Sequence, residues 1–221
     1  MNHTKERILD TAERLFAAQG YAATSLRGII AEASVNLAAV HYHFHSKEAL
    51  LEAVILRRSV PANQERLALL DRFEKEAGGT PPPLEKVIEA FVAPTFRMAR
   101  DPAGGGMVFM RLMGRLHAEG DLLSGILMAH FHDVLERFSA ALRRALPDLP
   151  PGELFWRLNF AIGALGQALR GGSKDLGIIA DLSLASNSEM ALEQLVAFLS
   201  AGFRAHVTAH AVEEAHAAVQ E

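Results

Sequence analysis

Hydrophobic residues recur along most of the chain with a period near 3.6, and no segment keeps the alternation expected of a strand. The first clear stripe lies within residues 4–19 and consists of Ile8, Ala12, Leu15, Phe16 and Gln19. Thr4 can cap such a helix at its N-terminus, and Gly20 suits its C-terminal end. The pattern therefore predicts an all-α protein that begins with a helix over residues 4–19.

Two short helices are predicted next. Thr24 or Ser25 is placed to begin the first of them, and the chain is expected to turn near Ser34. Asn36 is a favourable N-cap for the second, which we expect over residues 37–43. Together these segments predict a helical corner close to the N-terminus.

A longer helix follows, capped by Ser46 and carrying Glu48 in its first turn, where a carboxylate suits the helix dipole; it is expected to reach about Leu70. The linker Gly78–Pro83 separates it from the remainder of the chain. Beyond the linker, helices are predicted over residues 84–100, 107–117, 122–146 and 153–170, with a last one starting at Asn187 or Ser188. We expect a small helical domain over residues 1–50 and a larger helical bundle over 51–221.

Composition narrows the class of protein. Half of the residues are hydrophobic, which allows a sizeable core, yet no apolar run reaches the roughly 18 residues of a membrane span. There is no cysteine, which excludes disulfides and thiolate chemistry, and residues 1–10 are too polar for a secretory signal. These features predict a cytoplasmic protein that does not act at a membrane.

Charge is distributed unevenly. Residues 1–58 hold seven Lys and Arg against six Asp and Glu, whereas the remainder holds 15 against 20. A near-neutral N-terminal unit with local basic points beside an acidic body is compatible with specific DNA binding.

Residues Leu26–Phe44 have the length of a helix-turn-helix motif, whose second helix enters the DNA major groove while the first crosses the backbone. Compact or polar side chains on the second helix, together with groups at helix starts that favour a phosphate, are the candidate DNA contacts. They are Thr24, Ser25, Arg27, Asn36, Leu37, Ala38, Ala39, His41, Tyr42 and Lys47. The alternative is a helical hairpin packed for structure alone, with Tyr42 and His43 in the core.

Several motifs between residues 7 and 50 resemble the DNA-binding domain of the TetR-family regulators. They are Arg7-Ile8-Leu9, Leu15-Phe16, Gly20-Tyr21, Thr24-Ser25, Ile29, Ala33, Val35, Tyr42-His43-Phe44 and Ser46-Lys47-Glu48-Ala49-Leu50. The resemblance implies a homodimeric all-α repressor whose first three helices bind double-stranded operator DNA, while the remainder binds an effector and dimerises. The chain departs from the family's usual residues at Ser34, Ala38 and His41, so the operator sequence cannot be carried over.

A narrower resemblance extends into the C-terminal part. Val35–Val40, Phe109–Gly114 and Glu153–Arg157 with Phe160 and Gly163-Ala164 are similar to the PsrA-like branch of the family. That branch implies a response to long-chain fatty acids or acyl-CoA. The alternatives are a repressor of an efflux or detoxification gene that responds to another apolar or aromatic compound, and a helical protein–protein adaptor.

Residues 91–138 are rich in Phe and Met, whose flexible apolar side chains make adaptable pocket walls. The candidate ligand-binding residues are Phe91, Phe96, Met107, Met110, Arg111, Met113, His117, Phe131, Trp156 and Phe160. Arg97, Arg100, Arg111 and Arg115 could hold a carboxylate or CoA phosphates at the mouth. The alternative is that the apolar residues form an ordinary core.

Small residues on two of the predicted helices favour close helix packing. These helices, residues 153–170 and 188–207, are the expected dimer interface, although the same residues could pack within one subunit.

Ten histidines raise the question of a metal site, but His41, His43 and His45 diverge on a helix, and His206 and His210 lack an accompanying acid. We therefore expect neither a metal nor a cofactor, and no enzymatic activity.

Overall fold

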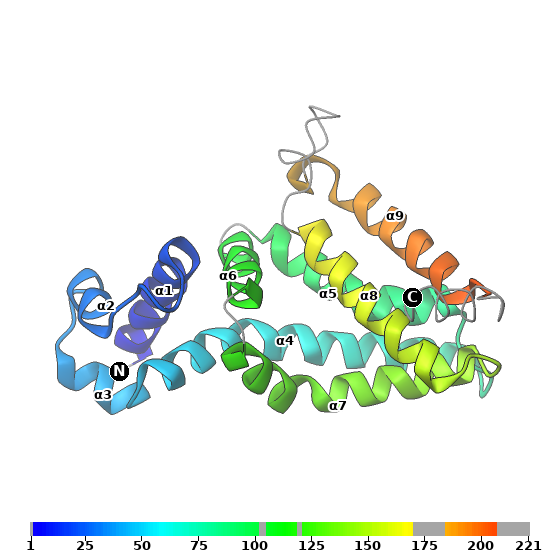
Figure 1. Ribbon diagram of the computed structural model, residues 1–221, viewed down its shortest axis with the longest axis horizontal. Coiled ribbons are helices and arrows are strands. Elements are labelled where there is room, and N and C mark those ends of the chain that lie inside the picture. The colour runs from blue at the N-terminus through cyan, green and yellow to red at the C-terminus, as the bar shows by residue number, and fades with distance from the viewer. Residues whose placement is uncertain (1, 102–104, 119–120, 170–183, 207–221) are drawn as a thin grey trace, which may run out of the picture.

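The computed structural model describes residues 2–101, 105–118, 121–169 and 184–206. Within these ranges the protein is entirely helical, which confirms the predicted fold class. The helices are α1 (Asn2–Gln19), α2 (Leu26–Glu32), α3 (Leu37–Phe44), α4 (Lys47–Glu76), α5 (Leu84–Arg100), α6 (Gly106–Ala118), α7 (Asp121–Ala145), α8 (Pro151–Leu169) and α9 (Leu184–Arg204). Figure 1 shows α1–α3 at one end of an elongated molecule and α5, α7, α8 and α9 at the other.

Side-chain caps begin three of these helices. The Ser25 hydroxyl accepts from the Gly28 N–H at 3.0 Å, and Asn36 Oδ1 accepts from the Ala39 N–H at 2.8 Å. Ser46 Oγ accepts from the Ala49 N–H at 3.0 Å. Each bond satisfies one of the backbone donors left open at a helix start, as the sequence predicted. Thr4 is not a cap, because α1 already begins at Asn2.

The turns around α3 depart from ordinary backbone geometry. Ser34, in the α2–α3 turn, has a φ of 52°, and His45, in the α3–α4 turn, has a φ of 62°. This left-handed region favours glycine, which the TetR-like pattern has where this chain has Ser34. The Ser34 carbonyl accepts a hydrogen bond from Arg7 on α1 at 3.2 Å, which ties the turn to the first helix.

The long helix α4 joins the two ends of the molecule (Figure 1). It extends beyond the predicted end at Leu70, because Phe73 continues its buried side and the chain leaves the helix only at Ala77. The expected domain boundary near residue 50 therefore lies inside this helix. α4 is therefore shared by both parts, since it packs against α1 and α3 as well as α5 and α7.

The bundle is organised around α5, which packs against α4, α6, α7, α8 and α9. Val87, Ala90 and Val92 of α5 are fully buried. α6 packs against both α5 and α1. The N-terminal helices therefore contact the bundle through α6 as well as through α4. No helix in the described ranges combines the length and apolar character needed to cross a membrane.

Candidate nucleic-acid interface and ligand cavity

The exposed side of α3 carries four of the ten side chains expected to contact DNA. Leu37 and Tyr42 are 54% and 67% exposed, and Ala38 and His41 are also exposed. The opposite side is anchored in the core of the N-terminal domain by two buried residues, Val40 and Phe44. The exposure of Tyr42 argues against the alternative in which it is a core residue.

The start of α2 differs from the expectation at one position. Ser25 and Arg27 are exposed, but Thr24 is buried, and its hydroxyl donates to the Gly20 carbonyl at 2.7 Å. The Thr24 side chain is thus directed toward the α1–α2 turn and not outward beside Ser25 and Arg27, and its contact with DNA stays a prediction. Asn36 is exposed and Ala39 is half-buried at the start of α3.

Lys47 lies at the N-terminus of α4, next to the end of α3. Its ammonium group is 4.1 Å from the centroid of the Tyr21 ring, and the Tyr21 hydroxyl donates to Glu48 Oε1 at 2.8 Å. Burial, reinforced by Glu48, raises the pKa of Tyr21. A backbone hydrogen bond at the helix start, followed by the bond from Tyr21, lowers the pKa of Glu48.

Tyr21 thus holds the Lys47 ammonium group at the N-terminus of α4, where the cation and the helix dipole both favour a phosphate. Sequence reasoning did not assign Tyr21 a role in the site. The sequence feature that could have indicated this role is an aromatic residue directly after Gly20, which ends the first helix.

Two family models match the chain. Residues 8–54 match the model described as bacterial regulatory proteins, tetR family. Residues 89–202, more than half of the chain, match the model described as the tetracyclin repressor-like C-terminal domain. The chain belongs to the TetR family.

Individual regulators are similar to parts of this TetR-family chain. YerO of Bacillus subtilis, an uncharacterized HTH-type transcriptional regulator, is 35% identical over 102 residues, which are 46% of this chain and 33% of YerO. UidR of Escherichia coli, an HTH-type transcriptional regulator, is 34% identical over 76 residues, which are 34% of this chain and 35% of UidR. In these matches the chain spans about a third of the length of the relatives. The families and relatives are regulators and not enzymes, in agreement with the prediction.

Solved structures share the fold over most of the chain. A TetR-family regulator from Shewanella sp. PV-4 superimposes with a TM-score of 0.63 at 18% identity, covering 90% of this chain and 97% of that one. SmeT, in a complex with triclosan, gives a TM-score of 0.59 at 24% identity, with 89% and 91% covered. At these identities the likeness establishes the fold.

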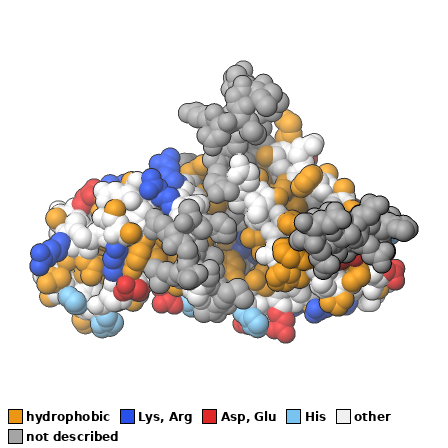
Figure 2. Space-filling model, viewed as in Figure 1, with side chains coloured by type: hydrophobic (Ala, Val, Ile, Leu, Met, Phe, Trp, Pro, Cys, Tyr) orange, Lys and Arg blue, Asp and Glu red, His pale blue; other side chains and the backbone are white. Residues whose placement is uncertain are grey.

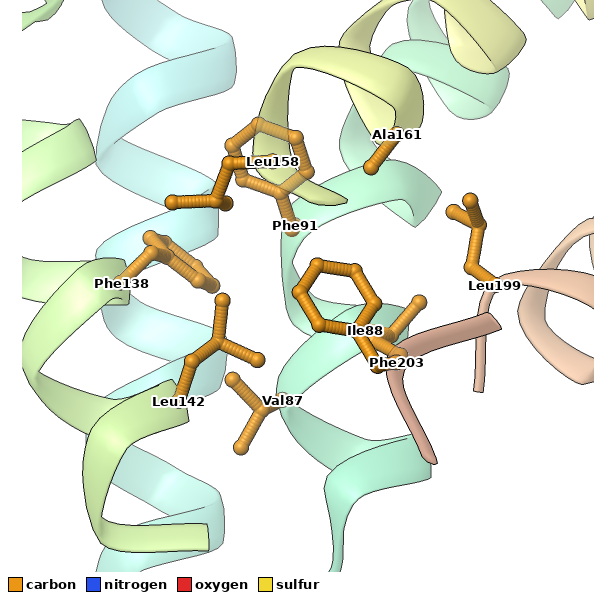
Figure 3. Close-up of a pocket in the computed structure, with 9 residues that line it drawn as sticks. All are labelled: Val87, Ile88, Phe91, Phe138, Leu142, Leu158, Ala161, Leu199 and Phe203. Carbon is orange, nitrogen blue, oxygen red and sulfur yellow. The ribbon is translucent and has the colours of Figure 1, made fainter. Parts of the chain in front are cut away.

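A small apolar cavity lies among α5, α7, α8 and α9 of this TetR-family protein (Figure 3). Its walls are Val87, Ile88, Phe91, Phe138, Leu142, Leu158, Ala161, Leu199 and Phe203. The space open to a water-sized molecule is about 10 Å³, which is room for about one water. The ring centroids of Phe91 and Phe138 are 5.2 Å apart, so aromatic side chains fill much of the space between α5 and α7.

The predicted ligand-binding residues do not form one site. Phe91 lines the cavity, whereas Phe96 and Met110 are buried in the core and Met113 and Phe131 are half-buried elsewhere. Met107 and Arg111 are exposed, and the side chain of His117 lies outside the described residues. Two of the arginines expected at the mouth form surface ion pairs instead, Arg97 with Glu65 and Arg100 with Glu189.

Trp156 and Phe160 belong to a different surface. They are 60% and 66% exposed on α8, and their rings stack with centroids 6.0 Å apart. Phe155 on α8 and Phe198 on α9 are exposed as well, and Figure 2 shows hydrophobic side chains gathered over these two helices. Exposed apolar side chains that gather in this way are typical of an interaction surface.

Among the residues that the structure describes, no three His, Asp or Glu side chains gather in a way that could hold a metal ion.

Proposed function

We propose that this TetR-family chain is a homodimeric transcriptional repressor that binds double-stranded operator DNA and is released by a small apolar effector. The observation that carries the proposal is the exposed side of α3, with Ala38, His41 and Tyr42 on it and Lys47 beside it. A short helix with compact and polar exposed residues can enter the major groove, and the start of α4 can bind a flanking phosphate.

The effector site of the proposal is the apolar cavity among α5, α7, α8 and α9. A long-chain fatty acid or its acyl-CoA ester suits such walls, since each buried CH₂ contributes about 0.8 kcal/mol. The present space holds about one water, so such a ligand would bind an arrangement in which these helices lie further apart. Effector binding would thereby favour one conformation of the bundle over another.

A chain of contacts supports the coupling between this cavity and the DNA-binding surface. Gly105, directly before α6, lines the same surface hollow as Arg58 of α4. Arg58 is in turn paired with Glu13 on α1. A movement of α5 and α6 would therefore reach α1 and change the spacing of the two recognition helices in a dimer.

A compact aromatic effector is the second candidate, in line with a repressor of an efflux or detoxification gene. The specific observation in its favour is that Phe91, Phe138 and Phe203 all line the cavity. Aromatic rings in contact with aromatic ligands gain offset or edge-to-face interactions beyond the area they bury.

The exposed aromatic surface of α8 and α9 is our proposed dimer interface. Phe155, Trp156, Phe160 and Phe198 supply the large apolar side chains that occupy the centre of such interfaces. Two half-sites on DNA require two recognition helices, so the proposed repressor needs a dimer.

The experiment is fluorescence anisotropy of the full chain on DNA from upstream of its own gene, titrated at fixed salt with long-chain acyl-CoA or a fatty acid. Tight, sequence-selective binding that the ligand reverses would support both parts of the proposal. Tight binding that neither ligand reverses would keep the DNA-binding regulator and favour the aromatic effector. An affinity for DNA that is weak at every salt concentration would instead favour the helical adaptor.

A further inference from the structure

Arg66 is a cation inside the bundle. Its residue is 6% exposed, and its side chain extends from α4 to α5. Nε donates to the Phe91 carbonyl at 2.8 Å, and Nη1 donates to Asn63 Oδ1 at 2.5 Å. Nη2 donates to the hydroxyl of Thr95. All of these acceptors are neutral.

No carboxylate in the described ranges lies within ion-pair distance of Arg66. Glu65 attracts it electrostatically but is paired with Arg97. Burial lowers the pKa of Arg66 to about 10, so the guanidinium is still charged at neutral pH. The bundle therefore contains a buried positive charge without an anion, which is unusual because buried charges are generally paired.

Hydrogen-bond donors also exceed acceptors around this charge. A guanidinium has five N–H groups, and the contacts to Asn63, Thr95 and the Phe91 carbonyl use three of them. Ser59 is 3% exposed, and its hydroxyl has no partner in the described structure. Ser59, Asn63 and Arg66 are spaced i, i+4 and i+7, so they follow one side of α4. A carboxylate, which accepts only, would complete this polar stripe.

Phe91 connects Arg66 with the apolar cavity. The Arg66 Cζ atom is 5.4 Å from the centroid of the Phe91 ring, and the same ring lines the cavity opposite Phe138 (Figure 3). Since the cavity holds only about one water, a ligand has to displace side chains to enter it. A displacement of the Phe91 ring would widen the cavity on the side of the guanidinium.

We infer that Arg66 binds the anionic group of the effector, and that the effector is a free monocarboxylic acid whose apolar chain occupies the cavity lined by Phe91, Phe138 and Phe203. The inference rests on the proposed function, in which that cavity is the effector site. The inference favours the free acid over its CoA ester. The thioester group has no charge for Arg66 to bind, and the large polar CoA group would have to be buried as well.

The test is isothermal titration calorimetry of the full chain with decanoate, decanol and decanoyl-CoA. The wild type should bind decanoate at least about tenfold more tightly than decanol, because hydrogen bonds to a charged group are among the stronger ones in proteins. Arg66→Gln should remove this preference. Arg97→Gln, which breaks an exposed ion pair between the same two helices, should leave it unchanged.

Arg66→Lys is the second variant, for the case in which Arg66→Gln does not fold. It keeps the charge but loses the planar fork of the guanidinium, so its preference for decanoate should be smaller than that of the wild type. Equal affinities of the wild type for acid and alcohol would overturn the inference, as would tighter binding of decanoyl-CoA. A preference for decanoate that survives in both Arg66 variants would overturn it too.

DNA binding separates this inference from the proposed function. If the protein binds its operator and decanol releases it as well as decanoate does, the proposed regulator is supported and the role of Arg66 is contradicted. If decanoate binds through Arg66 but the protein binds no operator, the role of Arg66 is supported and the proposed function as a regulator is contradicted.

Discussion

Arg58 on α4 holds both carboxylate oxygens of Glu13 on α1, with Nε 3.2 Å from Oε1 and Nη2 3.0 Å from Oε2. Arg57 donates to the same carboxylate and to Asp10 at 2.7 Å. Glu13 is only 3% exposed, so a buried carboxylate joins the first helix to the helix that continues into the bundle. The ion pairs of Glu13 thus join α1 to α4, which continues into the bundle.

Replacing Glu13 by Gln should destabilise the protein strongly. The substitution leaves Arg57 and Arg58, which are 17% and 20% exposed, without their buried partner. Losing one partner of a buried pair costs about 3–5 kcal/mol, and the partial exposure of the arginines favours the lower end. Urea unfolding followed by circular dichroism measures the loss.

Glu6→Gln is the matched control, because Glu6 pairs with Arg57 at 3.3 Å but is 49% exposed. We expect it to cost less than about 1 kcal/mol. Similar losses in the two variants would contradict the structural role assigned to Glu13.

Glu74 should contribute stability that depends on pH. Hydrogen bonds from Arg137, the largest cause, and the charge of Arg144 lower the pKa of this carboxyl below its ordinary value of 4.5. Because the folded-state pKa is depressed, the contribution is present above 4.5 and is lost as the pH falls through the folded-state value. Glu74→Gln should therefore be less stable by about 1–2 kcal/mol at neutral pH, with a difference that shrinks in acid.

Unfolding free energies of wild type and variant at neutral and acidic pH measure this difference. Glu76→Gln serves as the comparison, since Glu76 is 62% exposed and pairs with Arg72 at 3.5 Å. A gap between wild type and Glu74→Gln that stays constant into acid would refute the assignment.

Ser34→Gly should stabilise the helix-turn-helix. Ser34 has a φ of 52°, where a side chain costs roughly 1–2 kcal/mol relative to the right-handed region. Glycine adopts this geometry without that cost but loses more entropy on folding, so a net gain of about 0.5–1 kcal/mol is expected. The midpoint of urea unfolding should rise, and Ser34→Ala, which keeps the strained Cβ, should show no gain.

Local signals made the helix starts predictable. Ser25, Asn36 and Ser46 cap their helices through bonds to residues three positions ahead, so the sequence alone contains both partners. Thr24 also suits a cap by residue type, but its hydroxyl donates to the Gly20 carbonyl four residues earlier. Thr24 and Ser25 are adjacent and both favour helix starts, so residue type alone could not tell which of them caps α2.

The surroundings of the candidate ligand-binding residues were less predictable than the helix starts. Trp156 and Phe160 are as apolar as Phe91, and periodicity cannot tell an apolar side that packs inside one chain from one left outside. Arg66 was not identified either, because its significance lies in the neutral groups that α5 places around it. Both features depend on how the helices pack, which the sequence pattern of one helix does not report.

Lys47→Ala should weaken operator binding and make it less sensitive to salt. If its ammonium group contacts one phosphate, the slope of log affinity against log salt should fall by about 1. Tyr42→Ala should weaken binding to the operator more than binding to unrelated DNA, since Tyr42 lies on the exposed side of α3. Anisotropy titrations at several salt concentrations measure both effects.

Lys75→Ala removes the same kind of side chain from the opposite end of α4 and should change neither the affinity nor the slope. If Lys47→Ala behaves like Lys75→Ala, the start of α4 does not bind a phosphate.

Charge introduced into the exposed aromatic surface should separate the proposed dimer. Trp156→Glu or Phe160→Glu would bury a carboxylate among apolar rings in the interface, and we expect the dimer dissociation constant to rise about a hundredfold or more. Sedimentation velocity over a range of concentrations measures this directly. Operator affinity should fall with dimerisation, because a monomer presents only one recognition helix. Val60→Glu is the control, since Val60 is 43% exposed on α4, away from α8 and α9. A dimer that survives both substitutions on α8 would place the interface elsewhere, whereas a monomeric wild type would remove the basis for two half-sites.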